Sequence, residues 1–213
     1  MHLIVMPKIR EIVKNWFFWL LIITGIAIAI RSFPAWTNAI WGCDFGIYYG
    51  LTNSFVETKE LFNIYTGWGN SYQYFPVLYV ITGITHFITG IDVLIIMPKI
   101  IPIIGGLTVP ILYFIVLELI KDKRVALISA ALLSIATFHV YQTSHAAPLT
   151  VGHFFMLLSL YFFIKYMKKK TYTAPLLLST GLLVLSHHFT TYFYIVSITF
   201  ILFANMLAKH RTD

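Results

Sequence analysis

The sequence predicts an all-α, polytopic membrane helix bundle with about six transmembrane helices and short interfacial helices in a large first outer loop. The chain has 213 residues, of which 59% are hydrophobic and 11% are charged, whereas soluble domains have about 45–50% apolar and about 25% charged residues. The apolar residues form long runs, and most cations lie in short clusters between the runs. A soluble enzyme, a disordered chain, a coiled coil and a collagen-like chain are therefore excluded.

The lengths of the apolar runs require the helices to fold back. Residues 125–164 contain no Asp, Glu, Lys or Arg, and a single helix of that length would measure about 60 Å, twice the hydrocarbon thickness of a bilayer. The uncharged run 171–208 is almost as long. The polar stretches 141–148 and 186–191 therefore predict two outer turns, each between two helices.

The cations predict the orientation, because Lys and Arg in short loops stay on the cytoplasmic side. Twelve of the 15 cations fall into four clusters, which must then be separated by even numbers of crossings. We expect one membrane domain over residues 1–213, in the cell membrane with both termini cytoplasmic. Its spans lie at about 16–31, 94–120, 125–141, 148–167, 172–187 and 190–208, and the outer loop at 32–92. The clusters are Lys8, Arg10 and Lys14; Lys121, Lys123 and Arg124; Lys165, Lys168, Lys169 and Lys170; and Lys209 and Arg211.

One apolar stretch, residues 75–90, is expected not to cross the membrane. A crossing there would place the cluster at 121–124 opposite the other three, and the stretch is short for a span. We therefore predict a re-entrant or interfacial helix on the outer face. The first apolar run lacks a small-residue cleavage site, so it is expected to remain as an anchor.

The outer loop contains the strongest single candidate, Asp44. The segment 44–55 predicts a short helix with Asp44 at its N-cap, and Tyr48, one turn later, can share the side of Asp44. Two interpretations remain open for Asp44. It can cap the helix, or it can be a functional carboxylate in an apolar, aromatic setting, where an unpaired acid is costly.

The two later outer turns carry further polar candidates. Gln142 and His145 lie in the second turn, and His187 and His188 lie in the third. Polar groups that converge from separate segments on one face of an apolar protein are a candidate site, although histidines at span ends can also be ordinary interfacial residues. The sequence has no HExxH, zinc-spacing, P-loop or GxGxxG motif, so it supports no metalloprotease, zinc or nucleotide-binding site. We assign no metal ligand and no cofactor, and a divalent metal stays open without support from a motif. Because the cations lie in clusters between apolar runs, we expect no nucleic-acid partner. The single cysteine, Cys43, cannot form an intrachain disulfide.

Several short motifs together resemble the N-terminal module of the GT-C superfamily of membrane glycosyltransferases. These are the first span ending in Arg31-Ser-Phe-Pro34, the acidic motif Gly42-Cys-Asp44 followed by an aromatic helix, and Tyr74-Phe-Pro76 at the start of a short helix. The turn at 186–191 is similar to a His-His turn of archaeal members. The superfamily includes protein mannosyltransferases, aminoarabinose transferases and oligosaccharyltransferase catalytic subunits.

The resemblance implies a polyprenyl-phosphate-linked sugar as donor and membrane lipid as a partner. It implies that Asp44 acts as general base or orients the acceptor. A departing phosphate needs positive charge or donors, and Arg31, Lys99, His145, His187 and His188 are the outward candidates. Tyr48 and Tyr49 could line the sugar site.

The sequence departs from the family pattern in two ways. Oligosaccharyltransferase-type members place acids in the second outer turn to hold a divalent metal, but here that turn has no carboxylate. Family enzymes are also commonly longer, so a second subunit could supply missing helices. Two alternatives are a non-catalytic scaffold or accessory subunit that binds lipid-linked glycan or a partner enzyme, and a small transporter. The transporter is disfavoured because no predicted span carries a charge near its middle.

Overall fold

The computed structural model describes residues 15–38, 40–42 and 44–210, so Cys43 and the terminal cations Lys8, Arg10, Lys14 and Arg211 lie outside the described part. The all-α prediction is confirmed, because these ranges form helices and contain no strand. The elements in chain order are α2 (Trp16–Thr37), α3 (Phe45–Thr58), η1 (Asn70–Tyr74), α4 (Val77–Thr89), α5 (Val93–Gly106), α6 (Thr108–Ile120), α7 (Lys123–Ile135), α8 (Thr137–Thr143), α9 (Pro148–Lys168), η2 (Lys170–Tyr172), α10 (Thr173–Val184) and α11 (His188–His210).

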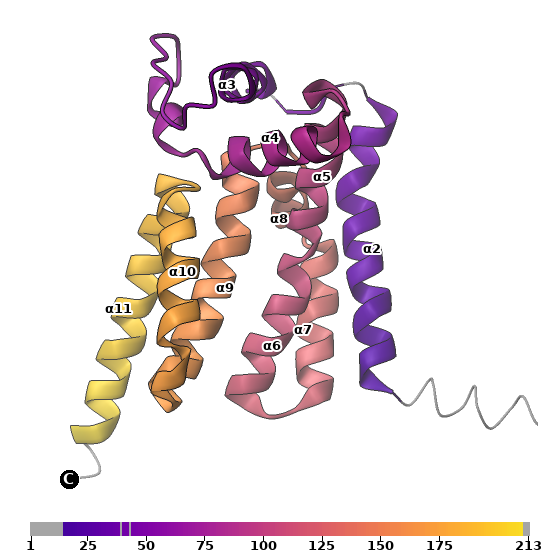
Figure 1. Ribbon diagram of the computed structural model, residues 1–213. Coiled ribbons are helices and arrows are strands. Elements are labelled where there is room, and N and C mark those ends of the chain that lie inside the picture. The colour runs from indigo at the N-terminus through magenta and orange to yellow at the C-terminus, as the bar shows by residue number, and fades with distance from the viewer. Residues whose placement is uncertain (1–14, 39, 43, 211–213) are drawn as a thin grey trace, which may run out of the picture.

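The long helices run side by side as a bundle (Figure 1). Among the described residues, four helical segments are long and apolar enough to cross a membrane: α2, α5 with α6 as Val93–Ile120, α9, and α11. The pair α7 and α8 passes the same test as one unit but is bent by 64° at Ala136, where a straight helix over 125–141 was expected. Helix α10 has 12 residues, about 18 Å, and is shorter than the span expected at 172–187.

Helix α2 continues past Arg31, its expected end, as far as Thr37. The helix passes through Pro34, which lacks an N–H donor and whose ring crowds the carbonyl four residues earlier. The carbonyl oxygen of Pro34 still accepts from the backbone N–H of Asn38 at 2.9 Å and from its side-chain amide at 3.0 Å. Arg31 therefore lies within α2 and not at its end.

Helices α3 and α4 lie across one end of the bundle, which we call the cap end together with the connections 144–147 and 185–187 (Figure 1). Helix α3 starts directly after Asp44, as expected, and buries Phe45, Tyr48 and Leu51. Helix α4 occupies most of the stretch 75–90 and has 13 residues. A side chain at Gly83 would lie 2.6 Å from the ring of Phe55, so the glycine permits close packing of α4 on α3.

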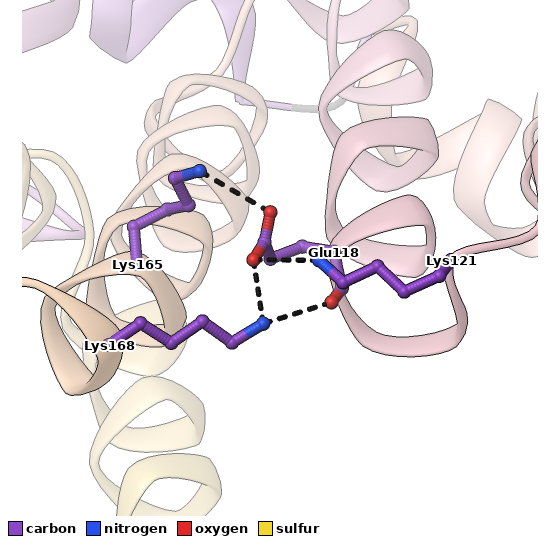
Figure 2. A network of polar contacts seen from close by, with 4 residues as sticks. All are labelled: Glu118, Lys121, Lys165 and Lys168. Carbon is purple, nitrogen blue, oxygen red and sulfur yellow. Dashed lines mark hydrogen bonds and ion pairs between the residues drawn. The ribbon is translucent and has the colours of Figure 1, made fainter.

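The opposite end, which we call the lysine end, holds residues 121–124 and 165–170. There the Glu118 carboxylate, at the end of α6, accepts from Lys121 at 2.9 Å, from Lys165 at 3.3 Å and from Lys168 at 2.6 Å (Figure 2). Because Lys165 and Lys168 belong to α9, these ion pairs join the ends of α6 and α9. Two cation clusters thus lie at the end remote from α3 and α4 (Figure 1).

Candidate functional site

A pocket of about 240 Å³ opens at the cap end. Four separate segments form it: residues 41–48, Tyr72 of η1, residues 141–149 from the end of α8 to the start of α9, and the α10–α11 connection. The pocket therefore combines Asp44, Tyr48, Gln142, His145 and His187, which the sequence places on one face. It is lined by Trp41, Gly42, Asp44, Phe45, Tyr48, Tyr72, Tyr141, Gln142, His145, Ala146, Ala147, Leu149 and His187.

Asp44 occupies the N-cap position of α3 but makes no side-chain capping bond there. Two other N-cap aspartates behave differently. The Asp92 carboxylate accepts from the N–H of Leu94 at 2.7 Å, and the Asp122 carboxylate accepts from the N–H of Arg124 at 2.7 Å. The Asp44 carboxylate instead lines the pocket. The capping interpretation of Asp44 is therefore not supported by its geometry.

One pocket wall is a cluster of rings around His145. The His145 ring centroid lies 4.6 Å from that of Tyr141 and 5.4 Å from that of Trp41, both edge to face. The indole N–H of Trp41 donates to the Ser144 hydroxyl at 3.0 Å, which fastens the outer loop to the α8–α9 connection. The Thr150 hydroxyl donates to the His145 carbonyl at 2.6 Å and fixes the connection from the α9 side. These contacts hold the His145 ring at the pocket.

The adjoining wall carries His187. A side chain at Gly152 of α9 would lie 2.9 Å from the Cβ of His187, so this glycine lets the start of α11 approach closely. The N–H of Val77 donates to the Leu185 carbonyl at 3.4 Å and joins α4 to the same connection. His187 is thereby buried, with 8% of its surface exposed, at the edge of the pocket.

Burial favours the neutral forms of His145, His187 and Tyr48 in the pocket. Burial lowers the pKa of His145, and the nearby Asp44 carboxylate opposes that shift in part. Burial and the neighbouring His188 lower the pKa of His187 to about 4. Burial, Tyr72 and Asp44 raise the pKa of the Tyr48 phenol. At neutral pH these three side chains are therefore neutral hydrogen-bonding groups beside Asp44.

Four of the expected binding residues do not line this pocket. Arg31 is fully buried in α2, and its guanidinium bonds to other parts of the protein. Lys99 donates to the Ala35 carbonyl at 2.8 Å and lies over the Trp36 ring. Tyr49 stacks on Phe45, and His188 contacts the rings of His187 and Phe75. Both cations instead bond between helices, so neither Arg31 nor Lys99 brings positive charge to the lining of this pocket.

Four aromatic residues line the pocket although the sequence does not assign them to a site: Trp41, Phe45, Tyr72 and Tyr141. The outer loop is rich in aromatic residues, which indicates that some of them line a site. Spacing does not select Trp41 or Tyr72, because neither lies in a long periodic helix.

A divalent metal, which the resemblance to oligosaccharyltransferases implies, does not fit the donor set. Among the described residues, no group of three or more His, Cys, Asp or Glu side chains is placed to hold a metal ion. Among the described residues that line the pocket, Asp44 is the only carboxylate. The described lining therefore offers no second acid to complete an oxygen-rich site of the kind that hard cations prefer.

The fold and the pocket define a class of protein: a polytopic membrane protein with a polar site at one end of its helix bundle. The model of the family described as oligosaccharyl transferase STT3, N-terminal, matches residues 46–212. The chain therefore belongs to the STT3 family, within the GT-C glycosyltransferase superfamily. Searches of curated proteins and of solved structures returned no significant match. The matched segment begins after Asp44, so the family match by itself assigns no role to this residue.

Proposed function

We propose that the chain is a glycosyltransferase module that transfers a sugar from a polyprenyl-phosphate-linked donor to an acceptor at the extracytoplasmic face of the membrane. The observation that carries the proposal is the Asp44 carboxylate, which lines a pocket at the cap end and does not cap its own helix. The lysine end faces the cytoplasm in this proposal, because clustered cations are retained there. The pocket then opens toward the outer leaflet.

In the proposed reaction Asp44 is the general base. Its carboxylate takes a proton from an acceptor hydroxyl or amide as that group attacks the anomeric carbon of the sugar. The bond between the sugar and the phosphate oxygen breaks, and the electron pair leaves with the polyprenyl phosphate. A general base must come within about 2.6–3.2 Å of the proton-bearing atom, which the open position of Asp44 permits.

The departing phosphate is stabilised by neutral donors in this proposal. The Gln142 amide, His145 and His187 line the pocket, and fixed hydrogen-bond donors in a partly dry site can stabilise developing negative charge. The aromatic walls of Trp41 and Tyr72 give the pocket the mixed apolar and polar lining that is typical of small-molecule sites. We assign no step to a metal ion, because the donor set does not fit one.

The test uses the full chain purified into lipid nanodiscs. Polyprenyl-phosphate-linked sugars are added with hydroxyl and amide acceptors, and both the released polyprenyl phosphate and the glycosylated acceptor are measured. We expect transfer that free isoprenyl phosphate inhibits. Saturable donor binding without transfer would instead identify an accessory subunit, and the absence of both binding and transfer would contradict the proposal.

A further inference from the structure

All N–H groups of the Arg31 guanidinium donate hydrogen bonds to other parts of the protein. Arginine has five N–H donors, and each has a partner here. Nε donates to the Thr143 hydroxyl at 2.8 Å. Nη1 donates to the carbonyls of Ala27 and Ser134, both at 3.1 Å, and Nη2 donates to the Leu133 carbonyl at 3.3 Å and to His139 Nδ1 at 2.9 Å. Within the described part of the chain, the ion pairs all belong to Glu118, so Arg31 is bound by neutral acceptors.

These acceptors lie around the bend between α7 and α8. The bend at Ala136 interrupts the helical hydrogen-bond ladder, so the last carbonyls of α7 need other donors. Arg31 supplies them to Leu133 and Ser134. A cation is also favourable at a helix C-terminus, and lipid offers no water as a substitute donor. Arg31 thus stabilises a bend that has neither proline nor glycine at its centre.

The same guanidinium reaches the far end of α8 through Thr143. The Thr143 hydroxyl accepts from Arg31 and donates to the His139 carbonyl at 2.6 Å. On another side, a side chain at Gly105 of α5 would collide with the Thr143 carbonyl oxygen. Arg31 of α2 is therefore bonded to the end of α7, before this short helix, and to His139 and Thr143 within it, and Thr143 also packs closely against α5.

Helix α8 and the connection after it form a large part of the pocket wall, although Arg31 itself does not line the pocket. We infer that Arg31 is a positioning residue, which sets the direction of α8 and so places the wall that faces Asp44. The part of this inference that concerns sugar transfer rests on the proposed function. The pocket-wall residues that Arg31 would position through α8 are Tyr141, Gln142, His145, Ala146, Ala147 and Leu149.

Lysine should not replace Arg31 in this role. Its three donors share one nitrogen, whereas the guanidinium spreads five donors over a rigid plane. A lysine would keep the charge but could not bond at once to the end of α7, His139 and Thr143. The Arg31→Lys variant therefore separates geometry from charge.

The test measures the position of α8 directly. In a Cys43→Ser background, nitroxide labels are placed at Phe138 of α8 and Leu178 of α10, which are 77% and 67% exposed, and the interspin distance distribution is recorded in nanodiscs. Arg31→Gln and Arg31→Lys should shift or broaden this distribution. The control Arg124→Gln removes an exposed arginine from the lysine-end start of α7 and should leave it unchanged.

Transfer provides the second readout. We expect Arg31→Gln and Arg31→Lys to lower kcat by roughly tenfold to a hundredfold, because small misplacements of a reacting site are costly. If Arg31→Gln does not fold, two variants decide the question: Arg31→Lys, and Thr143→Val, which removes the acceptor for Nε together with the hydroxyl bond to the His139 carbonyl. A wild-type distance distribution in the folded variants would overturn the inference. If the wild-type chain transfers no sugar, the proposed function fails, but the distance measurement still decides whether Arg31 places α8.

Discussion

Replacing Gly105 by alanine tests the close packing that supports the pocket wall. The new Cβ would collide with the Thr143 carbonyl oxygen and would lie 3.0 Å from the Thr143 Cβ. The first of these atoms is backbone, so the clash cannot be relieved by a rotamer change. Overpacking of this kind costs about 1–3 kcal/mol, and the helix propensity of alanine returns at most about 1 kcal/mol. Because Gly105 is near the end of α5, we expect a net loss of about 1–2 kcal/mol.

The assay is thermal unfolding of the purified chain in detergent, followed by tryptophan fluorescence. For a chain of this size, each kcal/mol changes Tm by about 2–4 °C, so Gly105→Ala should lower Tm by about 2–8 °C. Gly181→Ala is the matched control, because nothing lies within 4 Å of a side chain there, and it should leave Tm unchanged or raise it. A Gly105→Ala variant that melts at or above the wild-type temperature would refute the close approach of α5 and Thr143.

Three further perturbations address charge. Asp44→Asn should lower the pKa of His145 further, because it removes the carboxylate that opposes the effect of burial; an NMR titration with labelled histidine would show this, and an unchanged pKa would contradict the contact. The folded pKa of His187, about 4, lies below its ordinary value of 6.5, so between these pH values the unfolded chain binds more protons and stability falls as the pH is lowered, by about 2–3 kcal/mol between pH 7 and pH 4.5. Denaturation at pH 7 and pH 4.5 should show a smaller difference in His187→Gln, and an equal difference would count against this assignment. Glu118→Gln removes the acceptor that three lysines share, and it should lower the free energy of unfolding by about 1 kcal/mol at low salt and by less in about 1 M salt. A loss of stability that is equal at both salt concentrations would argue against the network in Figure 2. A loss no larger than that of the exposed Glu57→Gln control would argue against it as well.

The gathering of Asp44, His145 and His187 could be predicted from sequence. The lengths of the apolar runs require the two later turns, and the cation clusters place both turns on the side of the first outer loop. Run length and cation clustering are properties of whole segments, so an error of a few residues at a helix end does not change which turns share a side of the bundle.

The role of Arg31 could not be predicted in the same way. Its position before Pro34 indicates a helix end, but tertiary contacts continue α2 to Thr37. The bend at Ala136 contains no proline or glycine from which it could be predicted, and it is stabilised by the side chain of Arg31, which is more than one hundred residues away in the chain. Interactions at that separation leave no local pattern.

The central claim is that the Asp44 carboxylate performs chemistry in the pocket and does not merely cap α3. The most direct measurement is the single-turnover transfer rate of Asp44→Asn beside Asp92→Asn, with donor binding measured for both. Asp92 is a true N-cap at the same end of the bundle, so its variant controls for the loss of a carboxylate there. We predict that Asp44→Asn binds the lipid-linked donor and does not transfer the sugar, whereas Asp92→Asn transfers at close to the wild-type rate. Equal transfer by the two variants would contradict the claim.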